Sequence, residues 1–186
     1  MPTLKNRGVV ALYHVAEAID MIIMKISYFF LFLTLFAFQG LSAQAQQTVK
    51  TIQLDELQSL IAKEDGKTRV INFWATWCRP CVAEMPHFDA LSSRHKDVEV
   101  IFVSLDFADN LMSRVQPFVE RKNIQSEVVL LAEDDAAAWM PQINEGWQGN
   151  IPATLIVNQK QGIREFHAKE LSEAELNNLI QSTLNP

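Results

Sequence analysis

The feature that most constrains this chain is a pair of cysteines, Cys78 and Cys81, placed directly after an apolar run. They are the only 2 cysteines among 186 residues. The run 69–74 (RVINFW) is short, β-branched and aromatic, which is typical of a buried central strand. Pro80, between the cysteines, suits the first turn of a helix. We therefore expect a strand, a short loop and a helix, with both thiols at the helix N-terminus.

A purely structural disulfide explains this spacing poorly. A bridge across two intervening residues closes a very short loop and removes little entropy from the unfolded chain. Exchange chemistry fits better, because unpaired backbone N–H groups at a helix N-terminus favour a thiolate at the first cysteine. Cys78 is then the nucleophile that attacks a substrate disulfide. Cys81 attacks the resulting mixed disulfide and releases the reduced substrate.

Half of a zinc site is another reading of two cysteines at this spacing. The chain has no second cysteine pair, and His87 and His95 are eight residues apart, too far for two ligands on adjacent turns of a helix. The ligand count therefore argues against zinc, and we expect no metal site.

The rest of the chain from residue 48 alternates between strand and helix patterns. Residues 134–149, which contain tryptophan, are predicted to be irregular. The alternation favours an α/β fold. We expect strands at 49–52, 97–105, 127–131, 153–158 and 162–167, and helices at 54–61, 80–96, 111–122 and 171–184.

The N-terminal part has the pattern of an export signal. Residues 26–38 (ISYFFLFLTLFAF) are nearly all apolar and follow Lys25. In the stretch 42–45 (SAQA), small residues occupy the two positions that a signal peptidase recognises. We predict a signal peptide at 24–45 that is cleaved after Ala45.

An uncleaved membrane anchor is the alternative, since roughly 20 apolar residues span a bilayer. In either case residues 46–186 form the working domain outside the cytoplasm, in the periplasm or anchored facing it. The membrane is then reached only through the signal or the anchor. Residues 1–23 precede a sufficient signal, so we interpret them as an upstream extension or a misassigned start.

Charge argues against one class of partner. The chain has 16 basic and 22 acidic residues, of which the first 45 contribute three and two, so the domain carries 13 − 20 = −7. An acidic domain of this kind is not expected to bind nucleic acid.

The string 72–81 (NFWATWCRPC), followed by Glu84-Met85-Pro86, closely resembles the TlpA-like family of exported thiol-disulfide oxidoreductases, which includes the reductases of cytochrome c maturation. The resemblance runs from about Thr48 to the C-terminus and is strongest at 74–86 and 151–154 (IPAT). It implies a thioredoxin-like three-layer sandwich, with a central mixed sheet and helices on both faces. It also implies a redox-active Cys78–Cys81 disulfide and no metal or organic cofactor.

The resemblance assigns roles to two further positions. Pro152 looks like the cis-proline that faces the cysteines in this fold, leaving the backbone of Ile151 free to pair with an extended substrate. Glu84 matches an acidic residue that influences proton transfer at the cysteines, although a solvated helix glutamate is the alternative. Thioredoxins have a buried aspartate where this chain has Asn72, which cannot accept a proton from Cys81.

The residues around the cysteines are expected to face the substrate. We assign Trp77, Arg79 and Pro80 to this surface, with Arg79 either stabilising a thiolate or simply solvated. Trp74 is expected in the core. Trp147 either shapes the substrate groove or packs in the core.

These features predict a reductase of disulfides in exported proteins, with electrons supplied by a membrane-bound thiol reductant. A peroxiredoxin-like thiol peroxidase is one alternative, but its signature has Thr three residues before the reactive cysteine, where this chain has Ala75. A copper-binding assembly factor is another. Proteins of that kind space their cysteines by three residues and add a distant histidine.

Overall fold

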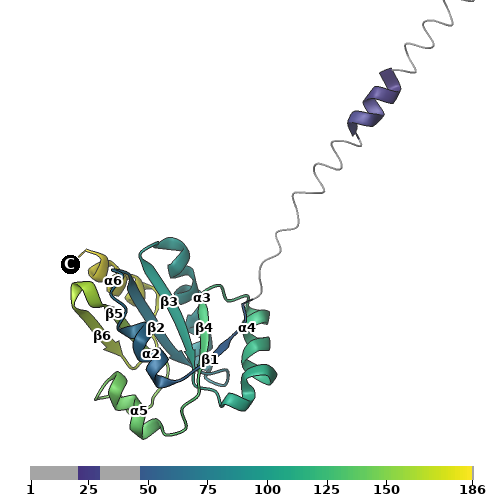
Figure 1. The fold of residues 1–186 in the computed structure, drawn as a ribbon. Coiled ribbons are helices and arrows are strands. Elements are labelled where there is room, and N and C mark those ends of the chain that lie inside the picture. Colours follow the sequence, from purple (N-terminus) through teal and green to yellow (C-terminus); the bar gives the residue numbers. More distant parts are fainter. Residues whose placement is uncertain (1–20, 30–46, 186) are drawn as a thin grey trace, which may run out of the picture. The chain divides into compact units, whose positions relative to one another are not determined.

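The computed structural model describes residues 21–29 and 47–185 (Figure 1). Residues 21–29 are helical. The rest of the predicted upstream extension and signal peptide, with the cleavage site, lies outside the described residues. Within the described part of the chain, no helix combines the length and apolar character needed to cross a membrane. All the elements named below belong to the compact unit Gln46–Pro186.

A six-stranded mixed sheet forms the centre of this unit, in the order β1-β4-β3-β2-β5-β6. Strands β1, β4, β3 and β2 are parallel, β5 is antiparallel to β2, and β6 is antiparallel to β5. The carboxyl ends of β2, β3 and β4 therefore share one edge of the sheet, here called the carboxyl edge, with the amino end of β5. The strands are β1 (Lys50–Ile52), β2 (Thr68–Trp74), β3 (Val98–Ser104), β4 (Glu127–Leu131), β5 (Ala153–Asn158) and β6 (Ile163–His167).

Helices cover both faces of the sheet, as predicted (Figure 1). One apolar cluster contains residues of α3, α4 and α6, and the other contains residues of α2 and α5, so the unit has three layers. The helices are α2 (Leu54–Ile61), α3 (Arg79–Arg94), α4 (Gln116–Lys122), α5 (Ala136–Ile143) and α6 (Glu173–Leu184).

Strand β2 connects the two halves of the core. All 7 of its residues are buried. Because side chains alternate along a strand, Val70 and Trp74 pack in the cluster on the α3 side, whereas Ile71 and Phe73 pack in the cluster on the α5 side. The apolar run that predicted a central strand is thus explained by burial on both faces.

The prediction of irregular structure at 134–149 was wrong for its first half, which forms α5. Three successive alanines begin this helix, and alanine has the highest helix propensity. The side chain of Asp135 caps it by accepting a hydrogen bond of 3.2 Å from the backbone N–H of Ala138. Trp139 and Ile143, one turn apart, are buried against the sheet.

The segment between β3 and α4 is more divided than a single helix 111–122. A 3₁₀ turn at Ala108–Asn110 and a π-helix at Leu111–Val115 precede α4. Pro117 lies in the first turn of α4 and has no N–H to donate, and the change from π-helix to α-helix falls directly before it.

Candidate active site

Cys78 and Cys81 form a disulfide at the start of α3. Cys78 is the N-cap residue, and its sulfur accepts a hydrogen bond of 3.3 Å from the backbone N–H of Cys81. Cys78 is 5% exposed, whereas Cys81 is fully buried. The helix N-terminus therefore faces the more accessible sulfur, which is the arrangement that stabilises a thiolate there after reduction.

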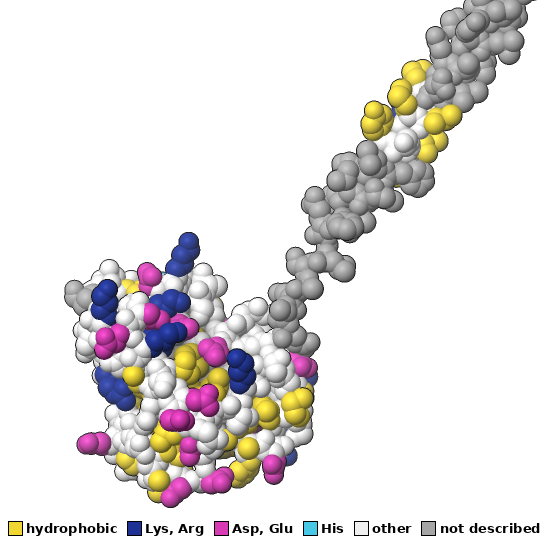
Figure 2. Space-filling model, viewed as in Figure 1, with side chains coloured by type: hydrophobic (Ala, Val, Ile, Leu, Met, Phe, Trp, Pro, Cys, Tyr) yellow, Lys and Arg dark blue, Asp and Glu magenta, His cyan; other side chains and the backbone are white. Residues whose placement is uncertain are grey.

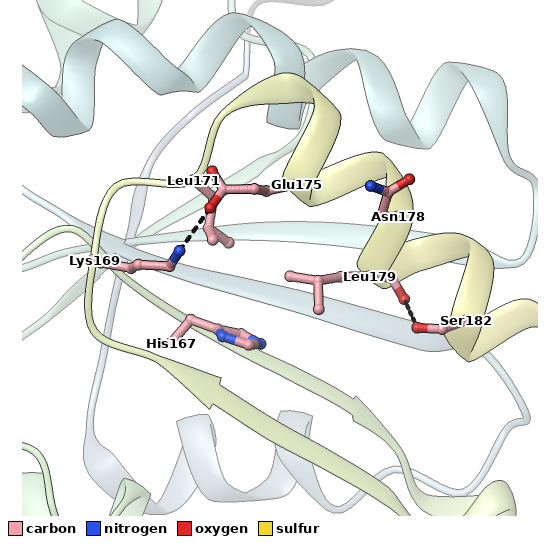
Figure 3. Close-up of a pocket in the computed structure, with 7 residues that line it drawn as sticks. All are labelled: His167, Lys169, Leu171, Glu175, Asn178, Leu179 and Ser182. Carbon is pink, nitrogen blue, oxygen red and sulfur yellow. Dashed lines mark hydrogen bonds and ion pairs between the residues drawn. The ribbon is translucent and has the colours of Figure 1, made fainter.

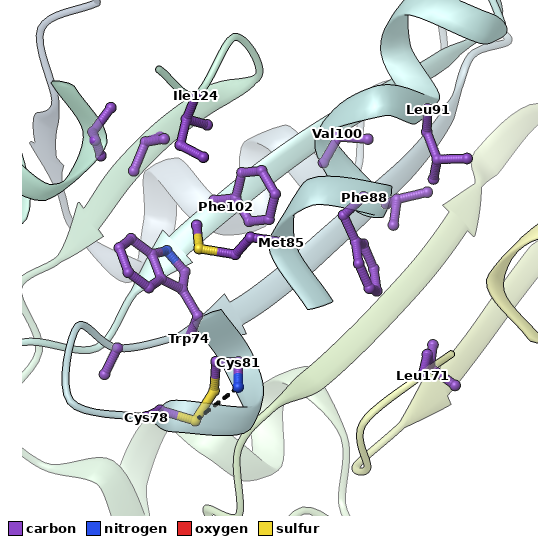
Figure 4. Close-up of a cluster of buried hydrophobic side chains, with 14 of the residues drawn as sticks. Trp74, Cys78, Cys81, Met85, Phe88, Leu91, Val100, Phe102, Ile124 and Leu171 are labelled. Atoms are coloured by element: carbon purple, nitrogen blue, oxygen red, sulfur yellow. Dashed lines mark hydrogen bonds between the residues drawn. A yellow bond between two sulfur atoms is a disulfide. The ribbon is translucent and has the colours of Figure 1, made fainter. Parts of the chain in front are cut away.

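The disulfide lies against the apolar cluster on the α3 side of the sheet (Figure 4). Trp74 and Met85 extend from β2 and α3 into this cluster, and the Trp74 ring packs against Phe118 with centroids 5.1 Å apart. The prediction of Trp74 as a core residue is confirmed. An apolar setting disfavours charge on the inner sulfur, so Cys81 needs a proton acceptor when it reacts as a thiolate.

Glu84, one turn after Cys81, is completely buried rather than solvated. Its carboxylate accepts a hydrogen bond of 2.8 Å from Nδ2 of Asn72 and one of 2.9 Å from the backbone N–H of Leu171. Burial raises the pKa of Glu84 from 4.5 to about 7, and these two hydrogen bonds only partly oppose that rise. The reading of Glu84 as a surface helix residue is therefore wrong.

Asn72 connects Glu84 to strand β5. Its Nδ2 also donates a hydrogen bond of 3.2 Å to the hydroxyl of Thr154. Its Oδ1 is buried and has no hydrogen-bond partner within the described part of the chain. The amide thus occupies the space between helix α3 and strand β5, and it supplies donors only.

The Ile151–Pro152 peptide bond is cis, as predicted. Pro152 is buried and immediately precedes β5. Because β5 is antiparallel to β2, with Ala153 paired to Phe73, this proline lies at the carboxyl edge from which the cysteine loop also departs. Ile151 packs partly against both apolar clusters.

The residues that flank the cysteines are accessible. Trp77 is 66% exposed, and Arg79 and Pro80 are also exposed. Arg79 has no ion-pair partner among residues 47–185. Trp147, by contrast, is buried with its ring centroid 4.7 Å from that of Phe73, so it packs in the core.

Asp106 is a site residue that the sequence analysis missed. It is buried at the end of β3 and accepts hydrogen bonds from the Thr76 N–H (2.8 Å), the Thr76 hydroxyl (2.6 Å) and the Ser104 hydroxyl (2.9 Å). These bonds fix the loop that leads to Cys78. The sequence did contain a signal for it. Asp106 comes shortly after the apolar run of β3, and an acidic residue in that position lies where the parallel strands end.

A cavity of about 400 Å³ opens between β6 and α6 (Figure 3). Leu171 lies in its wall, and its carbonyl is 2.9 Å from Nε2 of His87 while its N–H bonds to Glu84. An ion pair of 2.6 Å joins Lys169 and Glu175 across the same wall. His87 and Glu84 therefore both contact the backbone of Leu171. The cavity is lined by His167, Lys169, Leu171, Glu175, Asn178, Leu179 and Ser182.

Comparison with known proteins gives consistent matches. Residues 37–166 match the family described as AhpC/TSA family. The thiol-disulfide oxidoreductase ResA of Halalkalibacterium halodurans is 31% identical over 145 residues, which cover 74% of this chain and 76% of that protein.

Two solved structures are similar to the chain. The structure of MTB dsbF in its mixed oxidized and reduced forms has 28% identity and a TM-score of 0.52, covering 76% of this chain and 98% of that one. A thioredoxin-related protein from Neisseria meningitidis serogroup B has 23% identity and a TM-score of 0.56, covering 66% and 88% of the two chains. The second likeness supports the thioredoxin-like fold.

Proposed function

The chain belongs to the AhpC/TSA family, and we propose that within it the protein acts as a thiol-disulfide oxidoreductase that reduces disulfides of exported proteins. The observation that carries this proposal is the Cys78–Cys81 disulfide at the N-terminus of α3, in which Cys78 is 5% exposed and Cys81 is fully buried. The similarity to a relative named thiol-disulfide oxidoreductase supports it.

The proposed reaction consumes a substrate disulfide and the reduced dithiol. The Cys78 thiolate attacks one substrate sulfur, which forms a mixed disulfide and releases the other substrate sulfur as a thiolate. Cys81, deprotonated, then attacks the Cys78 sulfur, so that the second substrate thiolate leaves and the Cys78–Cys81 disulfide forms. Two electrons pass to the substrate. All of them come from the two cysteines, so the reaction requires no metal or organic cofactor.

Glu84 is proposed to accept the proton of Cys81. The two residues are one helical turn apart on α3, which brings their side chains to the same face. A carboxylate with a pKa of about 7 is matched to proton transfer near neutral pH. Asn72 orients it by holding Oε1.

We propose that a membrane-bound thiol reductant returns the protein to the dithiol form and that the reaction takes place outside the cytoplasm, with cytochrome c maturation as a candidate setting. The apolar stretch 26–38 and the Ser-Ala-Gln-Ala sequence at 42–45 support export. Disulfides form and persist in oxidising compartments outside the cytoplasm, which is where substrates of this kind occur.

A thiol peroxidase is less consistent with the site. Thr76 is the threonine nearest before Cys78, and its hydroxyl donates to Asp106 rather than to a cysteine. A copper-binding role has no support from the described residues. Among them, no group of three or more His, Cys, Asp or Glu side chains is arranged to hold a metal.

The test is the equilibrium of the cysteine pair with glutathione, combined with turnover. The reduced protein should reduce the disulfides of insulin, and Cys78→Ser should not. The Cys78–Cys81 pair should have a potential below that of glutathione, where about 30 mV corresponds to a tenfold change in the equilibrium constant. A potential well above that of glutathione would instead indicate an oxidant or an isomerase.

A further inference from the structure

Few large apolar side chains are exposed in the described part of the domain. Among residues 47–185, the exposed ones are Trp77 (66%), Phe107 (81%) and Met112 (72%). Trp77 follows β2, while Phe107 and Met112 lie in the segment that follows β3. Single exposed apolar residues are common, but all three lie in the segments that follow β2 and β3, which marks the carboxyl edge as a surface for contact.

The two aromatic residues are held in neighbouring loops. Strands β2 and β3 are parallel, and their pairing ends with Trp74 opposite Ser104. Thr76 and Asp106 lie two residues after the last residue of β2 and of β3. The hydrogen bonds from Thr76 to the buried Asp106 therefore continue the alignment of the two strands. Trp77 and Phe107 are the next residues, so the Asp106 contacts place an exposed aromatic ring on each loop, and Cys78 directly follows one of them.

A groove that Phe107 helps to line extends to α5. It encloses about 330 Å³ between the ends of β3 and β4 and the first turns of α5. Its apolar lining includes Leu131, Trp139 and Met140, and its lining carboxylates are Asp106, Glu133 and Asp134. No basic side chain lines it. Around the position of α5, Figure 2 likewise shows apolar and acidic side chains next to one another.

We propose that Phe107 and this groove bind the polypeptide segment that flanks the reacting disulfide of the substrate, and that this segment is both apolar and basic. The proposal rests on the function proposed above, because it assumes that a substrate disulfide approaches Cys78. A bulky apolar side chain of the segment packs against Phe107. A Lys or Arg nearby faces Glu133 and Asp134, which gains from charge complementarity at the groove rim.

Such a segment is characteristic of a partly folded polypeptide, in which apolar side chains next to a cysteine are still accessible. A folded partner would present the same disulfide with those side chains buried. The groove therefore favours substrates whose disulfides lie in exposed, apolar and positively charged sequence.

Binding is tested without redox chemistry. Two peptides are titrated into the oxidised protein by calorimetry, both with serine in place of cysteine: one carries Phe and Lys beside the serine, and the other carries Ser and Glu. The Phe-Lys peptide should bind more tightly, and Phe107→Ser should weaken its binding about tenfold, a typical effect of losing one large apolar contact. The double variant Glu133→Gln, Asp134→Asn should weaken it less at high salt than at low salt.

Arg94→Ser is the matched control, since Arg94 is exposed at the opposite end of the 16-residue helix α3 and should leave binding as in the wild type. Equal affinity of the wild type and Phe107→Ser for the Phe-Lys peptide would overturn the inference. So would equal binding of the two peptides by the wild type.

Reduction of the same peptides with their cysteines restored separates this inference from the proposed function. The wild type should show a higher kcat/KM for the Phe-Lys disulfide, and Phe107→Ser should bring the ratio of the two kcat/KM values close to one. Reduction of both peptides at equal kcat/KM by the wild type refutes the docking surface and leaves the reductase. Selective binding with no reduction of either peptide refutes the reductase and leaves the docking surface.

Discussion

Nδ2 of Asn72 donates a buried hydrogen bond of 2.8 Å to Oε1 of Glu84, joining the central strand to the helix that carries the cysteines. In the thioredoxins that this sequence resembles, the strand position of Asn72 carries an acidic residue. Here the strand supplies an amide, and the helix supplies the carboxylate. The acidic residue near Cys81 therefore belongs to helix α3 here, rather than to strand β2.

The first prediction concerns turnover. Replacing Glu84 by Gln removes a proton acceptor but keeps the shape of the side chain, so reduction of a disulfide substrate should slow by at least about tenfold, within the range of general base catalysis. In the wild type the rate should rise with pH through about 7 as Glu84 ionises, and this rise should be absent in the variant. Stopped-flow measurement of mixed-disulfide resolution between pH 5 and 9 tests both. Identical profiles would assign the proton to water.

The second prediction concerns stability. Glu84 has a pKa of about 7 when folded and 4.5 as its ordinary value, so the folded state binds more protons than the unfolded state between these pH values. The free energy of unfolding should therefore fall as the pH rises from about 4.5 to 7, by up to about 3 kcal/mol from this group.

The Glu84→Gln variant should lack that fall. Its stability above pH 7 should equal or exceed that of the wild type, because a buried charge is removed. The unpaired Oδ1 of Asn72 can accept from the new amide if Asn72 rotates, which limits the cost of losing an acceptor. Urea unfolding at pH 5 and pH 8 measures the difference. A wild-type stability that rises over this range would contradict the assignment of the pKa.

The third prediction concerns the order of attack. Cys78→Ser and Cys81→Ser should each abolish turnover, since the chain has no other thiol. Only Cys81→Ser should accumulate a mixed disulfide with substrate, because it retains the accessible nucleophile and lacks the residue that resolves the intermediate. Non-reducing electrophoresis after incubation with substrate shows the adduct. Equal trapping by both variants would be incompatible with the proposed roles.

The fourth prediction concerns Asp106. Asp106→Ala leaves the N–H and hydroxyl of Thr76 and the hydroxyl of Ser104 without their acceptor, so the free energy of unfolding should fall by about 2 to 3 kcal/mol. Asp109→Ala, at an exposed position three residues away, is the matched control and should change stability by less than about 0.5 kcal/mol. Denaturant unfolding distinguishes the two. A loss of equal size in both variants would show that local charge, rather than the Thr76 contacts, is responsible.

The fifth prediction concerns processing. Material recovered from the exported fraction should begin at Gln46, because the Ala43-x-Ala45 site ends the predicted signal. Mass spectrometry of the intact protein determines the first residue. Retention of residues 24–45 in a membrane fraction would establish the anchored form instead.

The sequence predicted the sheet well because its strands have unambiguous patterns. The run 69–74 is apolar on both faces, and the structure buries it on both faces. Helix α5 is not apparent from the sequence, because Pro141 and two glycines in a tryptophan-containing stretch are typical of irregular structure. The helix is stabilised by the Asp135 cap and by burial of Trp139 against Phe73. The contact between Trp139 and Phe73 joins distant parts of the chain, so the local sequence pattern does not reveal it.

The site was predictable where its residues are close in the chain. Cys78, Cys81 and Glu84 lie on consecutive turns of α3, and spacing alone placed them together. The contacts of Leu171 and Asp106 could not be predicted in this way, because they depend on how loops from distant elements meet at the end of the sheet. The burial of Glu84 could not be predicted either, because it depends on how the elements of the fold pack together.

The four tryptophans give the protein an optical reporter of its own redox state. Trp77 is 66% exposed next to Cys78, whereas Trp139 and Trp147 are each 4% exposed on the far side of the sheet. Trp74 is buried in the same cluster as the disulfide. Disulfides quench excited indoles by electron transfer at short range, so opening the Cys78–Cys81 bond should brighten the emission of Trp74 and Trp77 and leave that of the distant pair as a constant background. Electron transfer can then be followed in real time by fluorescence, without attaching a dye.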